Sequence, residues 1–361
     1  MQVLVIVSQT LLYVCFSILL GSFLLGLVPS TYRPSITTTR RLLAISTLGI
    51  PLLAFIPVLQ VILYLAPRLG TAESFLSVLT GFTIGKAWGW TLLLAVALLL
   101  IIGLVKETGN KVFNLTGVIL TILLILTIAW SSHASSVDQL AGFIGDTVHL
   151  LAVSVWTGIL GIVSWRATNT SNWRPFLTWF TPIAALCCVT VMGSGLLLMD
   201  VLMDGYMASW ASPYGQGLLI KHLFIIPLLF YAGVNGIWIN RKLKSDPNFN
   251  PKPWARLESV IIFIIFAITA AFSQLSPPSG GVGTEPSKLF MLVYEYDIPL
   301  DAAVQLEWNA MGILLLLLAC ACIGLMAMAF VKKAPRSMAL LLSSALVLCL
   351  YLALMTSVVF V

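Results

Sequence analysis

Charged residues are scarce in this sequence: they make up 9% of 361 residues, whereas hydrophobic residues make up 60% and the mean hydropathy is +1.04. A soluble chain of this length needs far more polar surface than that, so the composition excludes a soluble globular or disordered protein. Apolar runs close to the roughly 20 residues that cross a bilayer recur along the whole sequence. The sequence therefore predicts an all-α protein, a polytopic bundle of about ten transmembrane helices. The predicted spans are 2–28, 42–66, 88–105, 112–130, 143–165, 175–202, 217–239, 256–274, 308–331 and 337–361.

Sequence motifs of the common catalytic and nucleotide-binding sites are absent. The chain has no G-x-x-x-x-G-K-[ST] loop, no H-E-x-x-H and no G-x-S-x-G, so ATP hydrolysis and these hydrolase mechanisms are not expected. Its six cysteines all fall within predicted spans and form no C-x-x-C, which excludes an extracellular disulfide framework and a zinc knuckle. We therefore predict a protein that is not an enzyme.

Basic residues are distributed unevenly between the loops. Only Arg68, Lys86 and Lys288 fall in even-numbered loops, whereas nearly all other lysines and arginines fall in odd-numbered ones. Because cytoplasmic loops are enriched in Lys and Arg, both termini are predicted to lie outside. The net charge of +6 then reflects topology, and no nucleic-acid partner is expected. We divide the chain into a transmembrane core (1–275), an outer acidic loop (276–307) and two accessory C-terminal helices (308–361).

The fifth predicted span carries polar groups that are expensive in lipid. Asp146 and His149 lie one to two turns inside the predicted outer surface, and Trp156 shares their helix face, since at 100° per residue all three fall within an arc of about 80°. A charged side chain at mid-bilayer costs roughly 2.5 to 3.5 kcal/mol on insertion scales. The other two histidines, His133 and His222, also fall in the outer part of the membrane. A lone membrane histidine is more often a helix contact, but His133 and His149 together with nearby carboxylates indicate a metal or proton site.

Methionines follow the sixth span toward the same outer surface. Met199 and Met203 share a stripe with Met192 and Gly195. Such a stripe is typical of adaptable core packing, but a thioether next to imidazoles also favours Cu(I). Cys188 extends the stripe inward, either as a further soft ligand or as a small apolar filler.

Several spaced motifs resemble the copper resistance protein D (CopD) family. They are S-S-H-A at 131–134, D-T-V-H-L-L-A-V-S-V-W-T-G at 146–158, Y-G-Q-G-L-L-I-K at 214–221, Asn235, and R-L-E at 256–258 followed by an apolar helix that ends in S-P-P. The resemblance covers about residues 130–280 and is only general over the first three spans. It implies a multi-pass protein of the bacterial cytoplasmic membrane, associated with copper uptake and usually built on an eight-span core.

The residues and the resemblance together predict copper transport, in the import direction and with copper as Cu(I). The candidate metal site consists of His133 and His149 as nitrogen ligands, Asp146 as an oxygen ligand or orienting group, and Met199 and Met203 as soft ligands. The resemblance implies a CopC-like extracytoplasmic copper-binding protein and a cytoplasmic copper chaperone as candidate partners, besides the copper ion and the lipid bilayer. Two alternatives remain open: a haem-binding membrane redox protein, and a copper receptor or assembly factor that transports nothing.

Overall fold

The structure is a computed structural model that describes residues 1–105, 109–203, 205–277, 286–294, 304–332 and 334–360. Within these ranges ten helices are long and apolar enough to cross a membrane, which confirms the predicted all-α polytopic bundle. They are α1 (Gln2–Leu27), α2 (Arg40–Leu69), α4 (Thr83–Leu104), α5 (Lys111–Trp130), α7 (Gln139–Arg166), α8 (Trp173–Leu202), α9 (Pro213–Gly233) continued by a π-helix (Val234–Trp238) and α10 (Ile239–Ser245), α11 (Lys252–Phe272), α13 (Ala310–Val331) and α14 (Arg336–Met355). The shorter elements are α3 (Thr71–Gly81), α6 (His133–Val137), α12 (Lys288–Met291), two 3₁₀ turns (Ser30–Tyr32, Ala208–Ala211), β1 (Val304–Leu306) and β2 (Val358–Phe360).

Polar side chains set the starts of several spans. The Asn110 side chain accepts a hydrogen bond from the Val112 amide at 2.9 Å, and the Asp138 carboxylate accepts from the first amides of α7 at 2.9 and 3.0 Å. At α9 the Ser212 side chain caps the helix and Pro213 occupies its first turn. Each cap satisfies an amide that the helix itself leaves without a partner, so these helices begin close to the predicted positions.

The last predicted span is too long at its end. The helix α14 stops at Met355, and β2 pairs antiparallel with β1. The Glu307 amide also donates to the Ser357 carbonyl at 2.8 Å. The apolar, β-branched sequence of residues 358–360 predicts a continuation of the helix, but it suits a strand equally well once a second short strand is available.

By compactness the chain divides into two units, the first consisting of Met1–Val201 and Trp238–Ser259. Its centre is α1, which packs closely along α7. A side chain at Gly21 would place its Cβ 2.2 Å from the carbonyl carbon of Gly158, so the two backbones touch there. One turn earlier, Ser17 and Thr157 share a hydrogen bond of 2.7 Å. Small residues that allow such an approach are typical of helix pairs in membranes.

Loops that are predicted to lie on the cytoplasmic side meet at one end of this first unit. The Thr37 amide donates to the Arg166 carbonyl at 3.1 Å, and the Thr168 amide donates to the Ser35 carbonyl at 2.8 Å. The Arg40 guanidinium donates to the Val105 carbonyl, which connects this end with the next odd-numbered loop. The meeting of three odd-numbered loops is what the predicted topology requires.

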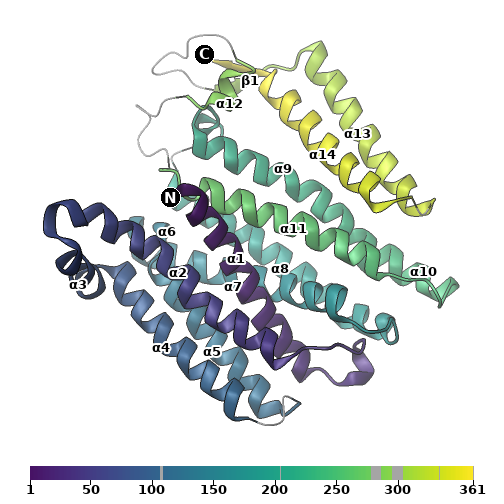
Figure 1. The fold of residues 1–361 in the computed structure, drawn as a ribbon. Helices are drawn as coiled ribbons and strands as arrows, with labels where there is room; N and C mark the ends of the chain where they lie inside the picture. Colours follow the sequence, from purple (N-terminus) through teal and green to yellow (C-terminus); the bar gives the residue numbers. More distant parts are fainter. Residues whose placement is uncertain (106–108, 204, 278–285, 295–303, 333, 361) are drawn as a thin grey trace. The chain divides into compact units, whose positions relative to one another are not determined.

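The second unit consists of Leu202–Ile237 and Val260–Val361. In Figure 1 the yellow-green α13 and the yellow α14 lie together, and α9 lies beside α14. Buried hydrogen bonds join α9 to α14: the Tyr231 hydroxyl donates to the Ala339 carbonyl at 3.0 Å, and the Tyr351 hydroxyl donates to the Gln216 amide oxygen at 2.6 Å. The C-terminal helices therefore share a compact unit with α9, and the division of the chain at residues 275 and 307 stays a prediction.

The predicted topology can be checked with two introduced cysteines. Lys288 precedes α13 and Ser337 follows it, and both side chains are exposed. A membrane-impermeant maleimide added to intact cells should label Lys288→Cys and should not label Ser337→Cys until the membrane is opened. Labelling of both positions in intact cells would contradict the assignment of α13 as a span.

Candidate functional site

The candidate residues on α7 face α8, and the two helices run antiparallel. A Cβ at Gly145 would lie 3.0 Å from Leu198, and His149 contacts Ser194. A step of four residues forward along α7, from Gly145 to His149, thus matches a step of four residues backward along α8, from Leu198 to Ser194. This register gives the relative depth of every candidate residue on the two helices.

A serine on α8 holds the imidazole of His149. The distance between His149 Nδ1 and Ser194 Oγ is 3.0 Å, and Ser194 Oγ also lies 2.7 Å from the Thr190 carbonyl oxygen. A hydroxyl has one proton, and the short contact with a carbonyl, which can only accept, takes it. Ser194 Oγ then accepts from Nδ1–H and Nε2 carries the lone pair, which is the neutral form of imidazole that can act as a metal ligand.

Small residues form the surface of α8 beside this histidine. A Cβ at Gly195 would lie 3.6 Å from His149 Cε1, which is an ordinary contact distance, so the imidazole lies directly beside the glycine. The Ser194 side chain itself is buried, at 8% exposed. Ser194 is not among the site residues predicted from the sequence. Its signal was present, since it is a polar residue between two glycines within an apolar span.

Asp146 lies about one turn before His149 on α7 and is half-buried. Its carboxylate is close enough to Tyr13 of α1 to act on the phenol electrostatically. The sequence predicts that Asp146 orients the His149 imidazole. In the structure Ser194 is hydrogen-bonded to His149 Nδ1, so Ser194 is a second candidate for that orienting role. Its role as a ligand stays a prediction.

His133 lies at the first position of α6, with an exposed side chain. The neighbouring Ala134 packs against α7 at Gly142, where an added Cβ would come 2.2 Å from the Ala134 carbonyl carbon. Gly142 precedes His149 by seven residues, or about 10 Å along the helix axis. The two histidines therefore lie at successive depths along α7, and their joint ligation of one ion stays a prediction.

The two candidate methionines belong to different units. Met199 is half-buried on α8, five residues beyond Ser194 and so about 7.5 Å along the axis. Met203 is 8% exposed and belongs to the second unit. Met192 is 52% exposed, as expected for a side chain that faces lipid. Among the described residues, histidine, cysteine and carboxylate side chains form no cluster of three that could hold a metal; Asp204, another residue near this end of α8, lies outside the described ranges.

The third histidine has a different environment. His222 Nδ1 lies 2.8 Å from the hydroxyl of Tyr206, whose ring contacts the imidazole edge-on at a centroid distance of 5.3 Å. Burial raises the pKa of Tyr206 to about 12, although a hydrogen bond with Trp210 opposes this, so the phenol keeps its proton at neutral pH. With Tyr206 as the donor, His222 carries its own proton on Nε2 and presents no lone pair.

The fold defines this chain as a polytopic α-helical membrane protein, with an oriented imidazole between two of its spans. The family model described as "Copper resistance protein D-like, N-terminal domain" matches residues 1–143, and the model described as "Copper resistance protein D" matches residues 174–272. The chain belongs to the copper resistance protein D family. No curated protein and no solved structure matches it.

The two matches contain different parts of the candidate site. His133 falls within the first match, and Met199 and Met203 fall within the second, whereas Asp146 and His149 lie between them. The family makes this a membrane protein of copper resistance or transport.

Proposed function

We propose that this protein carries copper as Cu(I) into the cytoplasm, through a site formed by α7 and α8 near their predicted outer ends. The observation that carries the proposal is the pair of hydrogen bonds at His149, 3.0 Å to Ser194 and 2.7 Å from Ser194 to Thr190, because together they direct a nitrogen lone pair away from Ser194. A hydrogen-bond partner on the other ring nitrogen fixes the imidazole tautomer and makes the ligating nitrogen more basic. Membership in a copper family supports copper as the ion.

In this proposal the candidate ligands act in order of depth. His133, exposed on α6, receives copper at the surface, and a CopC-like protein outside the membrane is the proposed donor. Asp146 attracts the cation and Met199, on the same unit, supplies soft sulfur, which favours Cu(I) over harder ions. His149 then holds the ion below the surface. Histidine and methionine bind copper tightly enough to capture it but release it more readily than a cage of cysteine thiolates does. Transport requires both capture and release.

The membrane potential supplies a driving force for this direction. One elementary charge that moves to the negative side gains about 2.3 kcal/mol per 100 mV. Cells that express the protein should therefore accumulate more copper than cells with an empty vector, and an uncoupler that collapses the potential should reduce the difference. Ag(I), which has the same charge and softness, should compete. Equal copper content in both strains would contradict import.

Removal of the two thioethers tests the choice of metal. We expect Met199→Leu with Met203→Leu to weaken Cu(I) binding by the purified protein about tenfold or more, because leucine keeps the apolar volume but supplies no sulfur ligand. Zn(II) binding should change little. The measurement is competition for Cu(I) against a chromophoric chelator. If both metals bind the parent and the variant equally, the stripe of methionines is ordinary core packing.

A further inference from the structure

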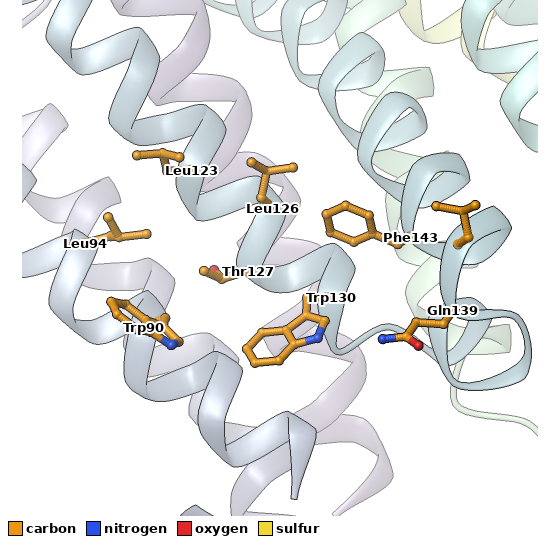
Figure 2. A pocket seen from close by; sticks show the side chains of 9 residues that line it. Trp90, Leu94, Leu123, Leu126, Thr127, Trp130, Gln139 and Phe143 are labelled. Carbon is orange, nitrogen blue, oxygen red and sulfur yellow. The ribbon is translucent and has the colours of Figure 1, made fainter.

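An apolar cavity of about 770 Å³, open along one side, lies between α4, α5 and α7 of the first unit (Figure 2). Its size falls within the usual range for small-molecule sites. It is lined by Trp90, Leu94, Leu123, Leu126, Thr127, Trp130, Gln139, Leu140 and Phe143. None of these residues is a proposed copper ligand, although three of them belong to α7, the helix that carries Asp146 and His149.

The polar atoms of the cavity gather at one end. Figure 2 shows the indoles of Trp90 and Trp130 and the amide of Gln139 at one level, with Leu123 and Leu126 further along α5. This polar end is the one predicted to face outward. Tryptophans at this level are typical of the boundary between lipid headgroups and chains. The cavity is therefore amphipathic in the same sense as a lipid molecule.

The cavity is a built feature of the helix packing. Thr91 of α4 and Thr127 of α5 share a hydrogen bond of 2.7 Å, and Thr127 also bonds the Leu124 carbonyl at 2.8 Å. These bonds join α4 to α5 where both helices line the cavity. From Leu123 to Trp130 the cavity follows α5 for about 10 Å, or two thirds of the roughly 15 Å of hydrocarbon in one leaflet.

A positive charge stands above the polar end. Lys86 is exposed and lies four residues before Trp90 on α4, so it shares that helix face one turn closer to the predicted outer surface. Few basic residues are expected on this side of the membrane. An anionic group about one turn above the indoles is the complement of this arrangement.

We propose that the cavity binds one phospholipid of the outer leaflet, with an acyl chain along Leu123 and Leu126 and with the phosphate at Lys86. The amide of Gln139 and the two indole N–H groups face the glycerol esters. The bound chain lies against Phe143 of α7, on the helix that carries Asp146 and His149. A lipid in this position supports the α4–α5–α7 packing and does not depend on the copper site.

Native mass spectrometry of the purified protein tests this inference, with dioleoyl phosphatidylglycerol and dioleoylglycerol as probes. The parent should retain one phosphatidylglycerol in mild detergent. Leu126→Trp, which fills the cavity, should retain neither probe. Lys86→Gln should bind phosphatidylglycerol about fivefold more weakly, the ratio that a single lysine contributes near a charged membrane surface, and should bind dioleoylglycerol as the parent does.

Matched controls are available on other faces. Leu317→Trp introduces the same bulk at an exposed position of α13, and Lys288→Gln removes another lysine from the predicted outer side; both should behave as the parent. If Leu126→Trp unfolds the protein, Leu123→Phe fills less of the cavity and repeats the test. Equal retention by Leu126→Trp and Leu317→Trp would overturn the proposal. The proposal would also be overturned if the parent were a dimer without retained lipid and Leu126→Trp were a monomer, because a second copy of the chain would then occupy the cavity.

Discussion

Replacement of His149 with phenylalanine should abolish most copper uptake without loss of the protein. Removal of a residue that hydrogen-bonds to a metal ligand typically lowers metal affinity 10- to 100-fold. We therefore expect removal of the ligand itself to lower copper uptake about a hundredfold or more. The protein should remain folded, since the substitution removes a polar group from lipid depth. Ser194 keeps its bond to the Thr190 carbonyl, so the substitution leaves no hydroxyl without a partner. Copper uptake by cells, normalised to protein level, measures the effect.

The same substitution at His222 is the matched control. That imidazole is also half-buried and hydrogen-bonded, to Tyr206 instead of Ser194, so His222→Phe should lose a bond but keep uptake. Ser194→Ala should lower uptake about tenfold, as expected for a residue that positions a ligand, and Ser194→Thr should restore part of it. Uptake at the parent level in well-expressed His149→Phe would contradict the assignment of this histidine.

A single methyl group at Gly158 should strongly destabilise the first unit. An added Cβ there would lie 2.1 Å from the Ser17 carbonyl oxygen and 2.9 Å from the Gly21 amide nitrogen. These are backbone atoms, which cannot rotate away, so α1 and α7 must separate. Overpacking usually costs about 1 to 3 kcal/mol, and we expect Gly158→Ala to lie at or above the upper end. Thermal unfolding in detergent should begin several degrees lower.

Gly161 provides the control for this prediction on the same helix. An added Cβ there has no atom within 4 Å, so Gly161→Ala should be neutral, or slightly stabilising because alanine favours helix. The comparison removes the effect of helix propensity. Equal stability of Gly158→Ala and Gly161→Ala would show that the close contact of α1 and α7 is absent in the protein.

Hydropathy alone predicts most of this fold. Ten spans follow from apolar runs, since in lipid a continuous helix is the way to satisfy every backbone group. The hydropathy pattern gives wrong or missing elements outside the lipid, where backbone groups can also bond to water or to a strand. It did not predict α3, which lies between two spans, and it extended the last helix past Met355 into residues that pair with β1. Strand pairing across about fifty residues has no signal in the periodicity of a single helix.

The candidate site is predictable only in part, for a similar reason. Helix periodicity places Asp146 and His149 on one face of α7, and both side chains are half-buried in the structure. It contains no information on which residue of α8 stands opposite, so Ser194 was missed. The depth of His133 likewise depends on how α6 packs against Gly142, which follows from the contact between Ala134 and α7 and not from sequence spacing. The ligand roles of all five candidate residues remain predictions.

Copper flux into liposomes that contain only the purified protein is the most direct test of copper transport. The protein, oriented as predicted, should carry externally added Cu(I) into sealed vesicles, faster when the interior is made electrically negative, and His149→Phe should reduce this flux to that of empty liposomes. A Soret band in the purified protein with no copper flux would support the haem-binding alternative. Stoichiometric copper binding without flux would instead indicate a receptor, and either result would contradict transport.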